Sequence, residues 1–275
     1  MKYGIAIRNM GPQSSRGAIL ACARAAEDAG FDALFVSDHL CIPPGQTEGS
    51  GGRYLDVLAT LAWLAGATQR IRLGVSVLVL PYRPAVLTAK QIATIQELSG
   101  GRMILGVGVG WMKPEFEALG VDMKKRGALA TETLRVIRHL FDSPEPAPFS
   151  AELVNFPAFV FEPRPARPPI WIGGGGPSAI RRVLEFGDGW HPMQRAAELK
   201  PLVEDLRGRM RAAGRPDPDI IVRRGLKLGD IAAARDRLDA EREAGATYFI
   251  LDLGRYADER EFAAAADTFI AKVAH

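Results

Sequence analysis

The chain has 275 residues, 47% of them hydrophobic and 24% charged, so its length and composition fit one large globular domain or two small ones. Its 35 Lys and Arg residues against 32 Asp and Glu give a net charge of +3, too small and too dispersed for a nucleic-acid-binding protein. The two cysteines lack metal-ligand spacing, so we expect no metal site and a reducing, cytoplasmic environment. We expect no membrane span because there is no apolar run of 18 residues, and no secretory signal because the first segment has the pattern of a strand.

Short apolar segments alternate with amphipathic helical patterns along the chain. Segments rich in Val, Ile and Leu predict eight strands: Tyr3–Ile7, Ala33–Val36, one within Ile71–Leu80, Met103–Val107, Ile170–Ile172, a short one at Gly189–Trp190, Asp219–Val222 and Tyr248–Leu251. Helical spacing predicts a helix after each of them: Ile19–Ala29, Leu55–Leu64, Pro84–Leu98, Leu129–Leu140, one from Pro177, Leu199–Met210, Ile231–Ala244 and Glu261–Val273.

A proline-rich segment interrupts this rhythm. Ser143–Pro169 contains eight of the 19 prolines, which is incompatible with a regular helix. We interpret it as an excursion from the main fold, with a small hairpin around Leu153–Phe161.

The alternation of strands and helices is typical of parallel βα units. A (β/α)₈ barrel needs about 250 residues, which agrees with this chain. The rival fold, a doubly wound open sheet, carries GxGxxG in its first turn, and the turn at Arg8–Pro12 does not. We therefore expect a single α/β domain over residues 1–275, a (β/α)₈ TIM barrel with a short insertion before the fifth strand.

Histidines follow two of the predicted strands. Active sites of such barrels lie at the carboxyl ends of the strands, where His39 and His191 fall, while His139 and His275 are expected to be solvated. Next to Asp38, the His39 imidazole suits proton transfer. The alternative is a loop-capping Asp beside a packed His, because adjacent residues of an extended segment point to opposite sides.

Four glycines, Gly173–Gly176, lie between the fifth strand and a helix that begins at Pro177. A helix N-terminus presents free N–H groups, and glycine lets an anion approach the backbone, so the segment suits a phosphate group. A tight strand-to-helix turn is the alternative. Arg181 and Arg182 on the next helix would attract an anion, or form a solvated helix face.

A second glycine pattern follows the fourth strand. Gly106, Gly108 and Gly110 alternate with apolar residues, which places a smooth surface on one side of the strand. A flat ring could lie against that surface, and tight packing inside the barrel is an equal explanation.

Together these stretches resemble the luciferase-like monooxygenase superfamily of flavin and deazaflavin barrels, and within it the branch that depends on the deazaflavin coenzyme F420. The matching stretches are FVSDH (35–39), RIRLGVSVLVLPYRPAVLTAKQIATIQELSGGRMILGVGVGWMKPEFEALGV (70–121), FEPRP (161–165) and PPIWIGGGGPSAIRRVLEFGDGWHP (168–192). The likeness becomes weaker after Pro192.

The resemblance implies a dimeric barrel whose third strand carries a bulge with a non-prolyl cis peptide, at Gly74–Val75 or Val75–Ser76. It implies that His39 is catalytic. Independently of the resemblance, Met10, Trp111, Trp190 and His191 suit the wall of an apolar substrate pocket, and ordinary core packing is the alternative for Met10 and the two tryptophans. Residues implied to hold the cofactor ring and phosphate are Asp38, Val75, Ser76, Gly108, Val109, Gly110, Gly174, Gly175, Gly176, Pro177 and Ser178. Trp111 stands where some sugar-phosphate dehydrogenases of the superfamily have a glutamate, so we do not expect that activity.

On this basis the sequence predicts an F420-dependent oxidoreductase that transfers a hydride to or from a small organic substrate. An FMN-dependent monooxygenase and a non-catalytic flavin-binding barrel are the alternatives. A sugar-phosphate lyase or isomerase would need a lysine or paired carboxylates at the strand ends, and we find no lysine at strands four to six.

Overall fold

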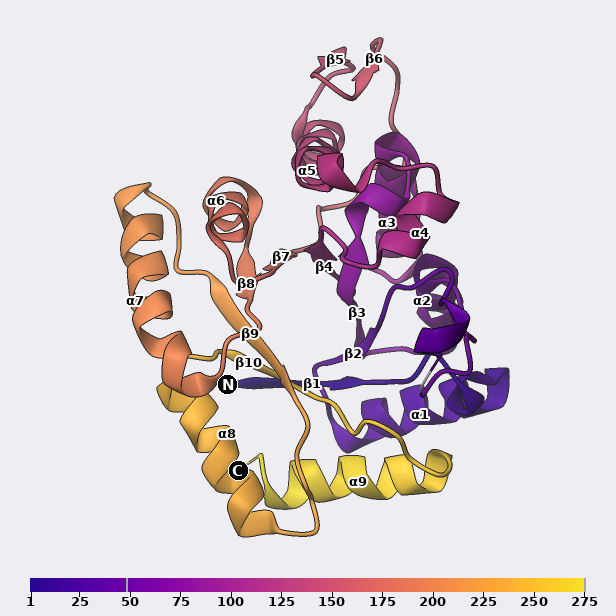
Figure 1. The fold of residues 1–275 in the computed structure, drawn as a ribbon, viewed down its shortest axis with the longest axis vertical. Coiled ribbons are helices and arrows are strands. Elements are labelled where there is room, and N and C mark those ends of the chain that lie inside the picture. The colour runs from indigo at the N-terminus through magenta and orange to yellow at the C-terminus, as the bar shows by residue number, and fades with distance from the viewer. Residues whose placement is uncertain (48, 275) are drawn as a thin grey trace.

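Eight parallel strands close into a barrel in the computed structural model, which describes residues 1–47 and 49–274 (Figure 1). Around the barrel the order is β1-β10-β9-β8-β7-β4-β3-β2. The strands are β1 (Lys2–Ala6), β2 (Ala33–Val36), β3 (Arg72–Val79), β4 (Met103–Gly108), β7 (Ile170–Gly173), β8 (Gly189–His191), β9 (Asp219–Arg224) and β10 (Tyr248–Leu251). The predicted (β/α)₈ barrel is confirmed.

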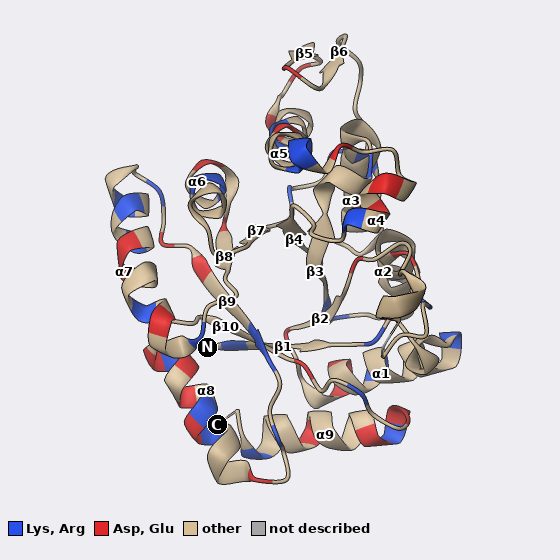
Figure 2. Ribbon diagram, in the orientation of Figure 1, with Lys and Arg blue, Asp and Glu red and all other residues tan. Residues whose placement is uncertain are grey.

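Helices surround the barrel, and many of the charged residues lie on them (Figure 2). They are α1 (Arg16–Ala29), α2 (Val57–Ala67), α3 (Ala85–Leu98), α5 (Arg126–Asp142), α6 (Pro177–Phe186), α7 (Ala196–Ala212), α8 (Ile231–Glu243) and α9 (Glu259–Lys272). A further short helix, α4 (Lys113–Ala118), follows β4 and was not among the predicted elements. None of the helices in the described part of the chain has the length and apolar character needed to cross a membrane.

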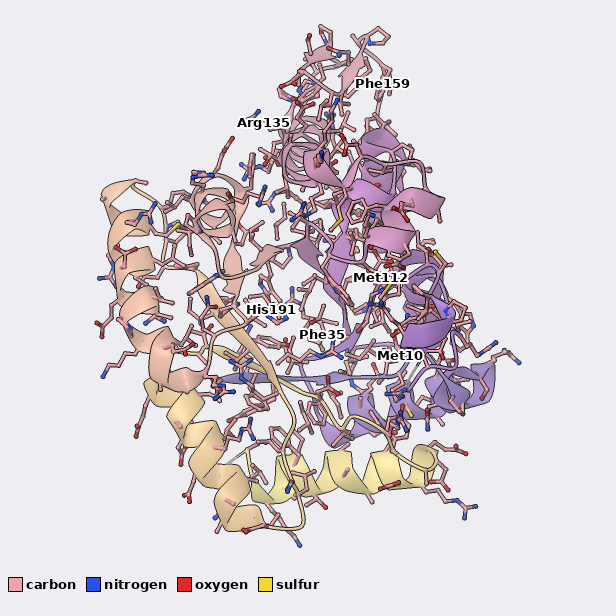
Figure 3. The ribbon with its side chains drawn as sticks, viewed as in Figure 1. Met10, Phe35, Met112, Arg135, Phe159 and His191 are labelled. Carbon is pink, nitrogen blue, oxygen red and sulfur yellow. The ribbon has the colours of Figure 1, made fainter. Side chains whose placement is uncertain are left out.

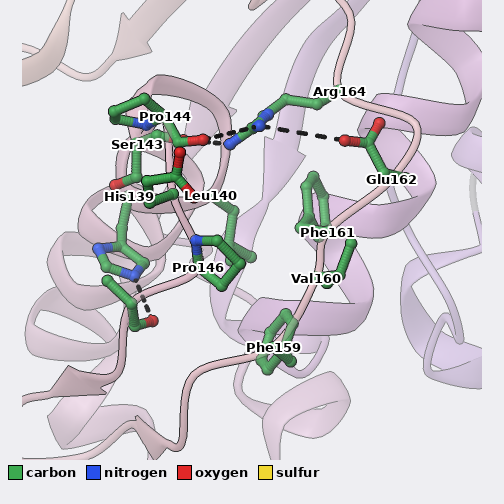
Figure 4. Close-up of a pocket in the computed structure, with 12 residues that line it drawn as sticks. His139, Leu140, Ser143, Pro144, Pro146, Phe159, Val160, Phe161, Glu162 and Arg164 are labelled. Carbon is green, nitrogen blue, oxygen red and sulfur yellow. Dashed lines mark hydrogen bonds and ion pairs between the residues drawn. The ribbon is translucent and has the colours of Figure 1, made fainter.

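The excursion before β7 forms a small lobe beside α5 (Figure 1). Its hairpin, β5 (Phe149–Ser150) with β6 (Asn155–Phe156), lies slightly earlier in the chain than predicted. His139 was expected to be solvated, but its ring packs edge-on against Phe149 and Phe156, and its Nε2 lies 3.0 Å from the carbonyl oxygen of Ala147. His275 lies outside the described residues. A groove of about 240 Å³ separates the end of α5 from the irregular segment around Phe161 (Figure 4).

Aromatic side chains from β2, β7 and β10 pack together inside the barrel. Phe35, Trp171 and Tyr248 are buried, with ring centroids 4.8–6.0 Å apart. A Cβ at Gly74 would lie 2.2 Å from the Phe35 ring, so glycine is required there for the ring to fit.

Candidate active site

A cavity of about 410 Å³ opens at the carboxyl ends of β2, β3, β4, β7 and β8. That volume is in the usual range of small-molecule sites, and its position is that of the active site in barrels of this kind. The residues that line it are Ser37, Asp38, His39, Ser76, Val77, Val79, Tyr82, Gly108, Val109, Gly110, Trp111, Gly173, Gly174, His191 and Met193. Figure 3 shows His191 inside the ring of strands, above Phe35.

A bulge in β3 shapes one wall of the cavity. The pairing of β3 with β4 shifts between Val75 and Leu78, and the peptide bond between Ser76 and Val77 is cis. The cis bond was expected one or two residues earlier, at Gly74–Val75 or Val75–Ser76, and that prediction is corrected here. Val75 itself is buried in the core and does not line the cavity, whereas Ser76 and Val77 do.

The alternating glycines make room for this bulge. A Cβ at Gly108 would lie 2.7 Å from Val77 Cγ2, and one at Gly173 would lie 3.3 Å from Val77 Cγ1. A Cβ at Gly106 would lie 2.1 Å from the carbonyl oxygen of Val75. Tight packing therefore explains Gly106, whereas Gly108 and Gly110 serve both packing and a smooth, side-chain-free cavity wall.

Asp38 and His39 point to opposite sides of the chain after β2. The Asp38 side chain is fully buried, bonds Arg83 through two contacts of 2.7 and 2.8 Å, and accepts the amide of Val79 at 2.9 Å. All of these contacts lie within the protein, so the Asp38 carboxylate has a structural role; the residue also lines the cavity, and its contact with a cofactor remains a prediction. Asp38 ties the end of β2 to the segment after β3 and so fixes the backbone that carries His39.

His39 faces the cavity and is held by a carboxylate that the sequence analysis did not identify. Its Nδ1 lies 2.9 Å from Glu115 Oε2, and Glu115 is fully buried. Glu115 also accepts hydrogen bonds from the Tyr82 hydroxyl at 2.7 Å and from the amides of Leu40 at 2.5 Å and Cys41 at 3.2 Å. Burial alone would raise the pKa of Glu115, but the hydrogen bonds from His39, the Leu40 amide and Tyr82 outweigh it and hold that pKa below its usual value. Glu115 is therefore ionised at neutral pH.

The floor of the cavity is polar, and the imidazole of His191 in it is neutral. His191 Nε2 lies 2.9 Å from Ser76 Oγ, and Arg223 Nη1 donates to the Ser76 carbonyl at 3.0 Å and to Ser37 Oγ at 3.1 Å. Arg223 is itself paired with Asp252 at 2.9 Å. Burial, followed by repulsion from Arg223 and Arg224, lowers the pKa of His191 to about 3. Ser76 and His191 thus offer neutral hydrogen-bonding groups at the bottom of the cavity.

The glycine turn after β7 leads from the cavity to the N-terminus of α6. Gly174 lines the cavity with a φ of 113°, while Gly176, Pro177 and Ser178 are exposed. Within the described part of the chain, the amides of Gly175, Gly176 and Ser178 have no backbone partner, and Gly176 caps α6 without a side-chain hydrogen bond. These free N–H groups suit an anion. Arg182 bonds Thr131 and Gly127 of α5, so its guanidinium is committed to packing helices together.

Two exposed apolar side chains stand at the mouth of the cavity. Trp111 after β4 is 67% exposed and Met193 after β8 is 85% exposed. Trp190 was expected to shape the pocket, but it is completely buried in the core, with its Nε1 donating to the Gly174 carbonyl at 2.7 Å. Met10 forms an isolated bridge with Tyr54 and is not among the lining residues. Trp111 and His191 do line the cavity, and Met193 is an addition that no sequence pattern indicated.

Comparison with known proteins agrees with this arrangement. A family model described as luciferase-like monooxygenase matches residues 1–272. A protein of Mycobacterium tuberculosis, itself described as uncharacterized, is 30% identical over 94% of each chain. The F420-dependent glucose-6-phosphate dehydrogenase of Kineococcus radiotolerans is 36% identical over 60% of this chain and 49% of its own length.

Solved structures share the fold over nearly the whole chain. An F420-dependent secondary alcohol dehydrogenase in complex with an F420-acetone adduct superposes with a TM-score of 0.83 at 16% identity, covering 99% of this chain and 98% of that one. The oxygenating constituent of 3,6-diketocamphane monooxygenase from Pseudomonas putida, in complex with FMN, gives 0.80 at 15% identity, covering 100% and 98%. At these identities the likeness shows the fold alone.

Proposed function

The chain belongs to the luciferase-like monooxygenase family, and from that premise we propose that it is an oxidoreductase that uses coenzyme F420, with His39 as its catalytic acid and base. One observation carries the proposal: His39 faces a cavity with a glycine wall, and the turn that lines this cavity at Gly174 leads to a helix N-terminus with free amides. The similarity to an F420-dependent dehydrogenase supports the choice of cofactor.

The residues present fit a flat, phosphate-bearing cofactor. Gly108 and Gly110 give a wall without side chains, Val77 supports it from β3, and Ser76 and His191 supply neutral hydrogen-bonding groups below. The amides of Gly175, Gly176 and Ser178 would hold the phosphate. When bound, the deazaflavin supplies or accepts a hydride at C5.

The chain's own residues would manage the proton and the substrate. His39 would pass a proton between its Nε2 and the substrate oxygen, the step for which an imidazole is suited near neutral pH. Trp111 and Met193 would cover the substrate and exclude water from the cavity. Because the lining residues include no lysine or arginine, an uncharged substrate fits the cavity better than a phosphorylated one.

The second candidate, an FMN-dependent monooxygenase, is supported by the fold it shares with an FMN-bound monooxygenase. Its ring and phosphate would contact the same residues, so the binding preference has to be measured. Cofactor-free protein is titrated with oxidised F420 and, separately, with FMN, and binding is followed by fluorescence.

Micromolar or tighter binding of F420 with much weaker binding of FMN is expected. Preference for FMN would favour the monooxygenase. Binding of neither by folded protein would exclude both. If F420 binds, a screen under reduced F420 with uncharged carbonyl compounds tests for turnover, and its absence throughout would favour a non-catalytic flavin-binding barrel.

A further inference from the structure

Glu115 is a buried carboxylate of the site to which the proposed function has so far assigned no role. It lies on α4, a short helix outside the barrel, yet its carboxylate is fully buried against the segment that follows β2. Its Oε2 faces the His39 Nδ1 and the Tyr82 hydroxyl, and its Oε1 faces the amides of Leu40 and Cys41. Both oxygens are therefore surrounded by donors.

This geometry determines which nitrogen of His39 carries hydrogen. An ionised carboxylate can only accept, so Nδ1 must be the donor, and in the neutral imidazole Nε2 is then left with a lone pair. The His39 ring is steadied by edge-on contacts with Tyr54 and Trp111, at centroid distances of 5.0 and 6.2 Å. Among the described residues no group hydrogen-bonds Nε2, which leaves that nitrogen for a substrate in the cavity.

We propose that Glu115 is a positioning residue that fixes His39 in the Nδ1–H tautomer, aims its Nε2 at the substrate and stabilises the imidazolium formed during the reaction. The inference rests on the proposed function. In the direction of alcohol oxidation, the hydroxyl proton moves to Nε2, the carbon-bound hydrogen leaves as hydride to the oxidised deazaflavin, and the product is the carbonyl compound. In the reverse direction the imidazolium returns the proton to the oxygen.

Glutamine at position 115 should invert the tautomer. Its carbonyl oxygen must accept the Leu40 and Cys41 amides, which places its NH₂ group against His39 Nδ1. Nδ1 then becomes the acceptor and Nε2 carries the hydrogen, which leaves no base facing the substrate. In serine proteases, loss of the carboxylate that orients the catalytic histidine reduces kcat by about 10⁴-fold.

A structural role alone would also make Glu115 important, because it anchors the loop at Leu40 and Cys41. Glu132 is a matched control for that role. It is a buried glutamate on α5 that accepts the amides of Leu153 and Val154, both at 2.9 Å, and among the described residues it makes no hydrogen bond to a residue that lines the cavity. Glu132→Gln should lower stability in a similar way while leaving His39 unchanged.

The tautomer is measured first, on ligand-free wild-type protein, from the ¹⁵N shifts of His39 above its titration range, with His39→Gln to assign the signals. We expect a protonated Nδ1 and a free Nε2 in wild type and in Glu132→Gln, and the reverse in Glu115→Gln. With cofactor and substrate, Glu115→Gln should lose about 100-fold or more in kcat, with KM and the F420 dissociation constant within about threefold.

An Nε2–H tautomer in wild-type protein would overturn the proposal whether or not the variant folds. So would a Glu115→Gln enzyme with kcat within threefold of wild type. The tautomer is measured on protein without cofactor. If F420 failed to bind, the proposed function would be wrong, but the assignment of the His39 tautomer would still be tested by the ¹⁵N shifts.

Discussion

His191 Nε2 lies 2.9 Å from Ser76 Oγ, which joins β8 to the bulge of β3 across two intervening strands. Arg223 lies beneath the pair and donates to the Ser76 carbonyl at 3.0 Å. Burial makes a positive charge on His191 unfavourable, and the nearby Arg223 guanidinium makes it more so. The surroundings of His191 at the floor of the cavity therefore favour its neutral form.

The depressed pKa of His191 should appear as a pH-dependent stability. Its folded value is about 3, below the ordinary value of 6.5, so between these values the unfolded chain binds more protons than the folded one. Stability therefore rises with pH through this window, is fully present above about pH 6.5, and falls as the pH is lowered. Between pH 6 and pH 4 we expect His191 to account for a loss of about 2 kcal/mol.

Urea unfolding of wild type and His191→Gln at pH 4, 5, 6 and 7 checks this expectation. The variant should lose less stability than wild type on acidification, because glutamine does not titrate. Above pH 7 the stabilities of the two proteins should change with pH in the same way. Parallel pH profiles for the two proteins would show that His191 is not held neutral by the fold.

Gly108 should tolerate no side chain. A Cβ there would meet Val77 Cγ2 at 2.7 Å, and Val77 is fixed in the bulge, so alanine must displace the cavity wall. We expect Gly108→Ala to cost about 1–3 kcal/mol of stability, as overpacking does, and to weaken F420 binding at least tenfold. Gly66→Ala on α2 is the control, since a Cβ there meets nothing within 4 Å and should stabilise by about 0.5–1 kcal/mol. Unchanged cofactor affinity in Gly108→Ala would mean that the wall does not contact the ring.

The barrel could be predicted from the sequence because each βα unit has a local pattern, an apolar run followed by apolar residues at helical spacing. The polar residues after the strands were also located correctly, but their partners were not. Glu115 lies 76 positions from His39 and belongs to a six-residue helix without a strong pattern, so only the folded chain brings them together. Trp190, in contrast, was expected in the pocket wall because it adjoins His191, but the structure places it in the core. Sequence position alone does not distinguish these two locations for a tryptophan.

Asp38 should matter for stability rather than for cofactor affinity. Its buried carboxylate pairs with Arg83, so Asp38→Asn leaves a largely buried guanidinium with only the half-exposed Asp56 as its charged partner and should cost about 3 kcal/mol. Asp56→Asn is a matched control. Asp56 also contacts Arg83, at 3.0 Å, but is 42% exposed, and asparagine can still cap α2, so a loss below about 1 kcal/mol is expected. Denaturant unfolding compares the two; equal losses would contradict a special role for the buried pair.

The glycine turn offers a test that separates an anion site from a simple connection. Gly176 caps α6 with a φ of −90° and a ψ of 169°, which any residue can adopt, and a Cβ there meets nothing within 4 Å. Asp is a better N-cap than Gly and complements the helix dipole, so Gly176→Asp should raise stability by a few tenths of a kcal/mol.

The same carboxylate would occupy the amides that a phosphate needs and would repel it. We therefore expect Gly176→Asp to weaken F420 binding at least tenfold in the fluorescence titration, whereas Gly229→Asp, at an exposed loop position with equal space, should leave it unchanged. A stabilised Gly176→Asp protein that binds F420 as tightly as wild type would show that the four glycines form only a turn. A stabilised protein with lost affinity is the combination expected if the new carboxylate accepts hydrogen bonds from the same N–H groups that hold the cofactor phosphate.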